Sequence, residues 1–173
     1  GSLIRVIDLA AKRIVGTIDF GRGLRPHCAV MGPKNGLLYV TTELENSVTV
    51  IDPLTLKILE TIPTGQAESH MFAITRDGKR GYTSNVGSGT VSVLDIAGRK
   101  VRNTISVAPQ AQRLALSVDE RWLFTADQTQ PRLAVIDTTT ETVARWVELP
   151  GIGYGTGYKV FLCCSIACKT GEQ

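Results

Sequence analysis

Hydrophobic and polar positions alternate along the chain in short runs, which is the pattern of β-strands with one buried face. In the segment SVTVID, residues 47–52, this alternation places Val48 and Val50 on the same side of an extended strand. Turn residues separate such runs, among them Asn-Gly at 35–36 and Asp-Gly at 77–78, which supply the positive φ angles of tight hairpins. No segment keeps the period of an α-helix. The sequence therefore predicts an all-β fold built from hairpins.

One hydrophobic pattern returns at an almost constant interval. Boxes of alternating apolar residues closed by aspartate lie 44, 43 and 42 residues apart and end at Asp8, Asp52, Asp95 and Asp137. An aromatic position keeps the last two intervals at Tyr39, Tyr82 and Phe124. A polar position keeps them at His27, His70 and Gln112. Three independent markers with one period indicate an internal repeat.

Each repeat contains four expected strands. The aspartate of a box starts a turn, because its carboxylate accepts hydrogen bonds from the N–H groups just beyond it, and a second strand follows, such as KVRNTI at 100–105. A loop then leads to an apolar strand, a hairpin turn and the aromatic strand. A four-stranded unit of this length is typical of one blade of a β-propeller, whose antiparallel sheets stand around a channel. A right-handed solenoid, the alternative, has shorter repeats with fewer hairpins. We therefore expect a propeller of about three and a half blades, beginning with the outer half of a blade at Leu3.

Three segments with the aromatic strand and the following box resemble the YVTN family of β-propeller repeats. They are LYVTTELENSVTVID at 38–52, GYTSNVGSGTVSVLD at 81–95 and LFTADQTQPRLAVID at 123–137. The run RPHCAVMGPKNG at 25–36 also resembles the Pro-His, apolar strand and hairpin turn of that family. The resemblance covers roughly residues 3–156 and implies a propeller fold. It also implies a periplasmic, extracellular or cell-surface protein, since members of the family have such locations and varied roles.

The chain divides into two regions by its repeat pattern. Residues 1–156 are expected to form the propeller blades, and residues 157–173 form an atypical tail that loses the repeat. The tail holds Cys163, Cys164 and Cys168, whose spacing lacks the paired ligands of a structural zinc site and the even distribution of a disulfide framework.

Blades left open at both ends would expose strand edges and apolar faces. Members of the resembling family usually close seven blades, so we expect two chains to pair as a homodimer that completes one ring. A small four-bladed ring closed by the tail is the alternative, and a truncated propeller without activity of its own is another.

Charge and hydrophobicity argue against nucleic acid as a partner and against a membrane span. With 19 Lys and Arg against 16 Asp and Glu, the formal charge is +3 and is scattered. The chain therefore lacks the basic patch that nucleic acid requires. No run reaches the ~18 apolar residues of a membrane span.

Candidate functional residues come from the loops at the channel mouth. Two sets of loops meet there: those that lead into the innermost strand of each blade, and those between the aromatic strand and the aspartate box. Such loops on a rigid scaffold often carry sites. The side chains expected there are Arg25, His27, Glu68, His70, Gln110 and Gln112. His27 and His70 could act as metal ligands or as a general base. Alternatively, each imidazole binds a neighbouring loop carbonyl and has a structural role only.

The sequence favours a non-enzymatic module that binds a small molecule or a protein and needs no cofactor. The alternative is a lyase or lactonase that depends on a divalent metal held by His27 and His70. Zinc needs about three or four ligands, and the third equivalent position holds Gln112, which is a poor ligand.

Overall fold

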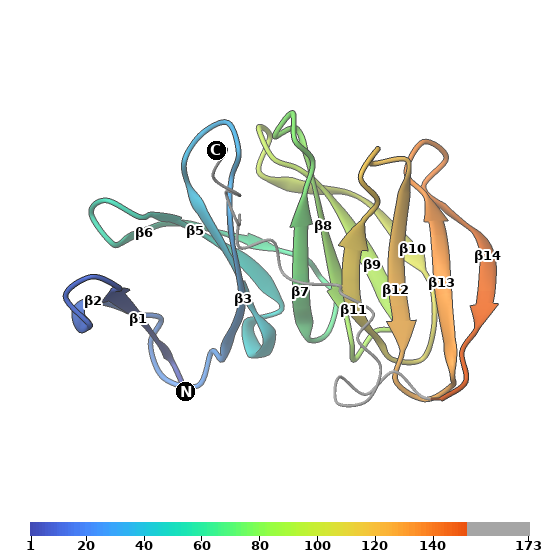
Figure 1. The fold of residues 1–173 in the computed structure, drawn as a ribbon, viewed down its shortest axis with the longest axis horizontal. Helices are drawn as coiled ribbons and strands as arrows, with labels where there is room; N and C mark the ends of the chain where they lie inside the picture. The colour runs from blue at the N-terminus through green and yellow to red at the C-terminus, as the bar shows by residue number, and fades with distance from the viewer. Residues whose placement is uncertain (152–173) are drawn as a thin grey trace.

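The computed structural model describes residues 1–151, in which fourteen β-strands form four antiparallel sheets (Figure 1). A two-stranded half-blade comes first, with β1 (Leu3–Asp8) and β2 (Arg13–Asp19). Blade 1 contains β3 (Pro26–Met31), β4 (Leu38–Thr42), β5 (Ser47–Asp52) and β6 (Lys57–Pro63). Blade 2 contains β7 (Ser69–Ile74), β8 (Arg80–Asn85), β9 (Thr90–Asp95) and β10 (Lys100–Ser106). Blade 3 contains β11 (Ala111–Leu116), β12 (Trp122–Asp127), β13 (Arg132–Asp137) and β14 (Thr142–Glu148).

The predicted all-β propeller of three and a half blades is confirmed. Strand order within each full blade follows the chain, and all four aspartate boxes end a strand, namely β1, β5, β9 and β13. The first strands of neighbouring blades lie against one another, with β3 beside β7 and β7 beside β11. The sheets therefore stand side by side as a fan whose inner edge is formed by β3, β7 and β11 (Figure 1).

Apolar side chains of neighbouring blades fill the spaces between the sheets. Tyr39 and Tyr82 occupy equivalent positions in blades 1 and 2, and both are buried in one continuous core. Val40 and Ile51 of blade 1 point to the other side and pack with Ile18 of the half-blade. Because both faces of blades 1 and 2 are covered, successive residues of β5 and β9 are buried, including polar ones such as Thr49 and Ser92.

The turn after each box has the same conformation in all four copies. The residue four places beyond the aspartate has a positive φ in each copy, and these residues are Lys12, Leu56, Arg99 and Glu141. The box aspartate accepts a backbone hydrogen bond inside the turn, as Asp52 does from Leu54 N–H at 2.8 Å and Asp137 from Thr139 N–H at 2.7 Å. The repeated sequence therefore encodes a repeated turn.

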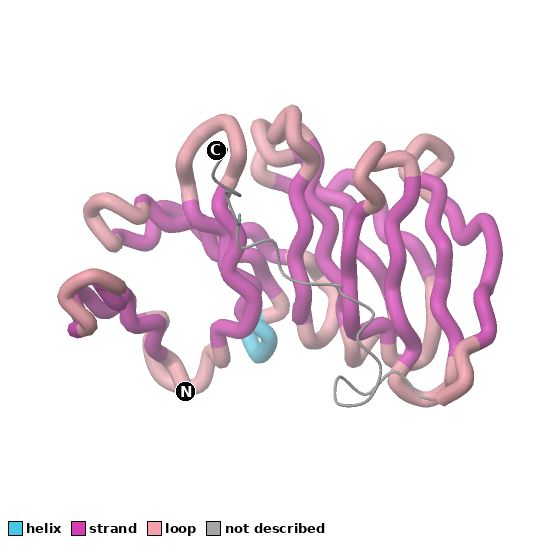
Figure 2. The backbone as a smooth tube through the Cα atoms, in the orientation of Figure 1, coloured by secondary structure: helices cyan, strands magenta, loops and turns pink. Residues whose placement is uncertain are grey.

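One short element was not predicted. Residues Glu43–Glu45 form η1, a single 3-10 turn between β4 and β5, which is the helical segment drawn in Figure 2. It ends at Asn46, which adopts the left-handed conformation with φ of 56°.

The predicted boundary between propeller and tail at residues 156 and 157, and the three tail cysteines, lie outside the described residues. In residues 1–151, no helix has the length and apolar character that a membrane span requires.

Candidate functional site

The two histidines singled out in the sequence lie together at the channel mouth. His27 is the second residue of β3 and His70 the second residue of β7, so the contact between these inner strands makes their rings neighbours. The imidazole rings are stacked, with centroids 3.7 Å apart and planes inclined by 26°. Repeat-equivalent positions on adjacent blades have thus become one site.

A buried carboxylate completes this site. Glu43, the first residue of η1, is 2% exposed and reaches across from blade 1 to blade 2. Its Oε1 lies 2.6 Å from His70 Nδ1 and 3.9 Å from His27 Nε2. Its Oε2 lies 2.8 Å from Arg25 Nε. We call Arg25, His27, Glu43 and His70 the mouth cluster.

Hydrogen bonding determines which nitrogen of neutral His27 carries the proton. His27 Nδ1 lies 3.2 Å from the backbone carbonyl oxygen of His70. A carbonyl oxygen can only accept, so Nδ1 carries the hydrogen and the lone pair is on Nε2. The side chain is 34% exposed. His27 therefore presents an accessible base beside a buried carboxylate.

His70 is held in place from both sides. Burial lowers the pKa of His70, the nearby His27 lowers it further, and the bond to Glu43 opposes this change only in part. The neutral ring donates Nδ1–H to Glu43, and its Nε2 is buried with no hydrogen-bond partner among the described residues. The backbone carbonyl of His70 also accepts the hydroxyl of Thr41 at 2.6 Å.

The other predicted candidates do not join the mouth cluster through any hydrogen bond or ion pair found in residues 1–151. The carbonyl oxygen of Glu68 accepts a hydrogen bond from Val86 N–H, and that of Gln110 accepts one from Gln128 N–H. The equivalent bond in blade 1 runs from Glu43 N–H to the carbonyl oxygen of Arg25. The carbonyl oxygen of Gln112 accepts the hydroxyl of Ser84 at 2.5 Å. A ligand contact for the side chains of Glu68, Gln110 and Gln112 stays a prediction.

The repeat pattern does not identify Glu43 as a candidate. Glu43 does not recur with the repeat, because the equivalent positions hold Val86 and Gln128. A charged residue that departs from the repeat directly after strand β4 is the sequence signal that points to it.

The mouth cluster contains the residue types of a metal site but not the geometry. His27, Glu43 and His70 each offer a ligand atom, and these atoms lie within 4.8 Å of one another. The lone pairs of imidazoles lie in the ring planes, and nearly parallel stacked rings direct them side by side. One ion could bind both histidines only if a ring turned and the bond between His70 and Glu43 broke. These residues therefore fit a proton-transfer site better than a divalent metal.

Comparison with known proteins identifies the family. The family described as lactonase, 7-bladed β-propeller, matches residues 6–146. The chain belongs to this lactonase family. The narrower YVTN family remains a resemblance of the repeated segments.

A solved structure titled as hydrazine synthase from Kuenenia stuttgartiensis has the same fold, with a TM-score of 0.71 and 24% identity. The similarity covers 77% of this chain and 38% of that chain, so our chain spans well under half of its length. At this identity the likeness concerns the fold alone. The comparison with curated proteins gives no match.

Proposed function

We propose that the mouth cluster is the acid–base centre of a lactonase-type hydrolase that opens a cyclic ester with water. The observation that carries this proposal is the hydrogen bond from His27 Nδ1–H to the carbonyl of His70, which leaves His27 Nε2 as a base 3.9 Å from Glu43. Membership of the lactonase family supplies the reaction class.

The proposed reaction needs only water and one proton carrier. A water molecule gives a proton to His27 Nε2 while its oxygen forms a bond to the lactone carbonyl carbon. The ring C–O bond of the tetrahedral intermediate then breaks, and the ring oxygen takes the proton back from His27. The product is an open hydroxy acid, and His27 returns to its neutral state.

Glu43 and His70 support the charge that forms on His27. The buried carboxylate of Glu43 stabilises the imidazolium at 3.9 Å, as acidic partners of catalytic histidines do. Because the pKa of His70 is lowered, His70 stays neutral and does not repel the imidazolium. Its ring stacks on His27 and limits the rotation of the base.

Arg25 is placed to bind the substrate. Its Nε donates to Glu43, while 57% of its side chain is exposed. No hydrogen bond within residues 1–151 uses its terminal nitrogens, so they can donate to the carbonyl oxygen as negative charge develops there. In this role Arg25 would be the electrophilic partner of His27.

The complete site would extend beyond this chain's three and a half blades, since the family ring has seven. We retain the homodimer as the way to complete the ring, and a periplasmic or extracellular location, as proposals. The binding-module hypothesis and the metal-dependent hypothesis compete with acid–base hydrolysis at the same mouth.

The decisive experiment measures acid release by the full chain from a panel of γ- and δ-lactones in a pH-stat, with and without a chelator. We expect chelator-resistant hydrolysis, and a loss of about a hundredfold or more in kcat/KM for His27→Ala. Lys57→Ala, at an exposed position on β6, is the control and should retain full activity. A wild-type chain that opens none of the lactones would favour the binding module, and activity lost to chelator and restored by zinc would favour the metal site.

A further inference from the structure

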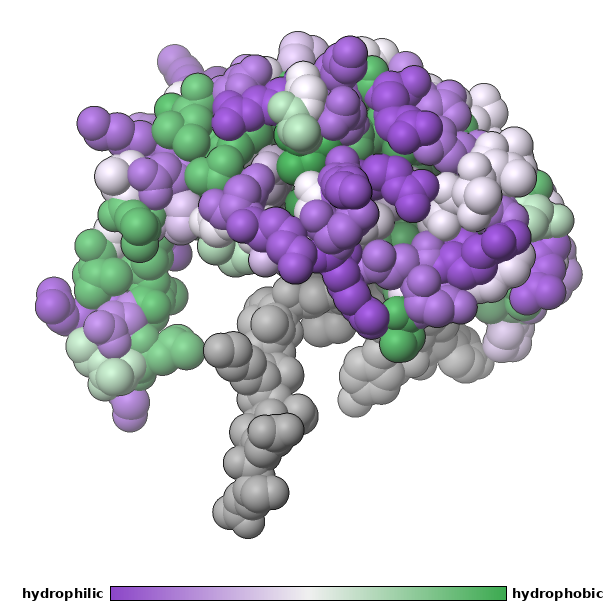
Figure 3. Space-filling model, turned by 90° about the horizontal axis from the view of Figure 1, so that it is seen from above, coloured by the Kyte–Doolittle hydropathy of each residue, from purple (hydrophilic) through white to green (hydrophobic). Residues whose placement is uncertain are grey.

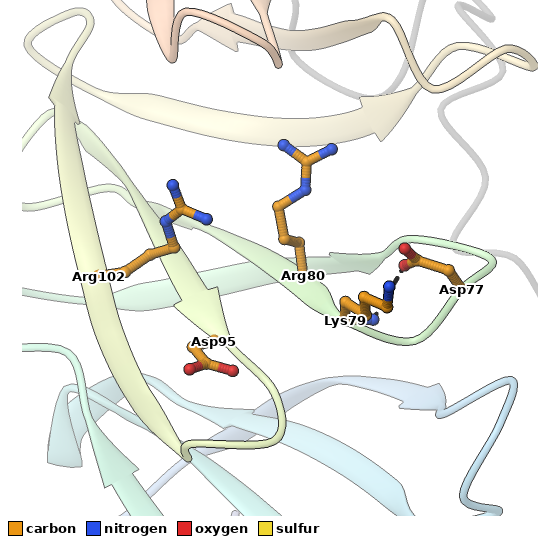
Figure 4. Close-up of a pocket in the computed structure, with 5 residues that line it drawn as sticks. All are labelled: Asp77, Lys79, Arg80, Asp95 and Arg102. Carbon is orange, nitrogen blue, oxygen red and sulfur yellow. Dashed lines mark hydrogen bonds between the residues drawn. The ribbon is translucent and has the colours of Figure 1, made fainter.

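A polar pocket lies on blade 2, at the turns opposite the channel mouth. It has a volume of about 500 Å³ and is lined by Asp77, Lys79, Arg80, Asp95 and Arg102 (Figure 4). Arg80 Nη1 donates to the carbonyl of Thr138 in blade 3 at 2.8 Å, and Arg102 pairs with Glu141 of the same blade at 3.2 Å. Two of the lining residues therefore also contact blade 3, and the pocket shares no residue with the mouth cluster.

The repeat provides an internal reference for this pocket. The positions of Arg80 and Arg102 in blade 2 correspond to Leu37 and Leu59 in blade 1. Leu37 packs against the hydrophobic core at the interface of blades 1 and 2. An apolar residue therefore packs at the position of Arg80 in blade 1, whereas Leu59 is exposed. The arginine pair is a departure specific to blade 2.

Tyr82, beside the arginine pair, lacks the hydrogen bond that its counterpart makes. The hydroxyl of Tyr39 accepts Asn35 Nδ2–H at 2.8 Å, but the position of Asn35 is taken by Gly78 in blade 2. The hydroxyl of Tyr82 is buried without a hydrogen-bond partner among the described residues. Buried hydroxyls normally have a partner, so this interface lacks an acceptor.

Tyr82 and Arg80 share one face of β8, because alternate residues of a strand point the same way. Burial raises the pKa of the Tyr82 hydroxyl; the nearby charges of Arg80 and Arg102 lower this pKa, while those of Glu141 and Glu120 raise it. The two guanidinium groups and the hydroxyl therefore lie in one electrostatic environment.

The carboxylates of the pocket leave guanidinium donors available. Asp77 accepts the hydroxyl of Thr75 and the N–H of Lys79, and Asp95 accepts the N–H of Gly98. Within residues 1–151, no ion pair joins Asp77 or Asp95 to either arginine. Glu141 pairs with Arg102 and accepts Asn103 Nδ2–H.

We propose that this pocket of blade 2 binds an oxyanion, the phosphate or carboxylate group of a small ligand, between Arg80 and Arg102. Each guanidinium has N–H donors beyond the bond already described, and such groups bind oxyanions through paired, charge-assisted hydrogen bonds. The buried hydroxyl of Tyr82 is not among the groups that line the pocket, so the two arginines are the proposed contacts. Lys79 adds positive charge at the rim (Figure 4).

Titration calorimetry of the full chain with inorganic phosphate, at constant ionic strength, tests the proposal, and acetate in a parallel titration separates phosphate from carboxylate ligands. We expect saturable binding of one anion per chain. The affinity for it should fall about tenfold or more in Arg80→Leu and in Arg102→Leu, since each variant loses a charge-assisted hydrogen bond. Leucine is the residue that blade 1 carries at both positions, so these variants are compatible with the fold.

The matched control is Arg145→Leu, which removes the same charge from an exposed position of β14 in blade 3. It should bind phosphate as the wild type does. Equal weakening in this control, or the absence of saturable binding of either anion, would overturn the proposal.

Discussion

His70 Nδ1 lies 2.6 Å from Glu43 Oε1 and so ties the inner strand of blade 2 to the loop that leaves β4 in blade 1. The same carboxylate holds Arg25 through its other oxygen. A single buried residue therefore connects two blades and orients three side chains at the channel mouth.

Replacing this carboxylate should cost stability. In Glu43→Ala, His70 Nδ1 would remain buried without its acceptor, and we expect a loss of about 1–3 kcal/mol in the free energy of unfolding. Urea denaturation measures this value. Glu148→Ala, an exposed position on β14, serves as the control and should change stability by less than about 0.5 kcal/mol. Equal effects of the two substitutions would contradict a structural role for Glu43.

The lowered pKa of His70 makes stability depend on pH. The unfolded chain takes up a proton near the ordinary pKa of 6.5, while the buried ring resists protonation until lower pH. Above about pH 6.5, burial of the neutral His70 ring therefore costs no stability. As the pH falls below this value, the free energy of unfolding declines, and the decline levels off below the pKa of the folded state. Urea denaturation between pH 8 and 5 checks this, and His70→Gln should flatten the decline. Stability of the wild type that rises on acidification would refute the assignment.

The hydroxyl of Thr41 should position both histidines. Thr41 Oγ1 accepts the N–H of Cys28 at 2.9 Å and donates to the carbonyl of His70 at 2.6 Å, and the residue is fully buried. Thr41→Val removes both of these bonds, so we expect a loss of about 1–3 kcal/mol on urea denaturation. Thr41→Ser keeps both bonds and should lose clearly less. The same bond recurs between Ser84 and Gln112, so Ser84→Ala should also destabilise the chain.

The propeller fold could be predicted from the sequence because strands and turns are encoded by a few adjacent residues. Alternation of Val48 and Val50 places an extended strand, and the carboxylate of Asp52 starts the next turn by binding amides two and three residues on. Both effects depend on a few adjacent residues, so they can be recognised without tertiary contacts. The equivalent positions of His27 and His70 placed both at the channel mouth on neighbouring blades, but the stacking of their rings was not predicted.

Glu43 and η1 could not be inferred in this way. A single 3-10 turn is too short to show a period, and the burial of a charged side chain is decided by partners from other parts of the chain. Arg25 and His70, which compensate the carboxylate, lie 18 and 27 residues away from it along the sequence. The acidic centre of the mouth cluster therefore becomes recognisable only once the blades are assembled.

The half-blade predicts association of two chains. Strand β1 pairs only with β2 within residues 1–151, and exposed apolar side chains gather at this end of the molecule (Figure 3). They include Leu3, Ile7, Ile14 and Val15. We expect sedimentation equilibrium to give twice the chain mass of 18.7 kDa. A Leu3→Lys and Ile7→Lys double variant should shift the mass toward that of one chain. A wild type that stays at 18.7 kDa at all concentrations would refute the homodimer.

Gly89 should be the least replaceable glycine of blade 2. It has a φ of +65°, and a Cβ at this position would collide with the backbone carbonyl of Ala108. Its own carbonyl accepts the N–H groups of Val107 and Ala108, so the backbone cannot move away without losing these bonds. Gly36 has a similar φ of +67° but open space around it. Gly36→Ala should therefore cost only the backbone strain of about 1 kcal/mol, whereas Gly89→Ala should lower the free energy of unfolding by at least twice as much. Urea denaturation of the two variants compares them directly, and equal losses would show that the loop after β10 yields to the added methyl group.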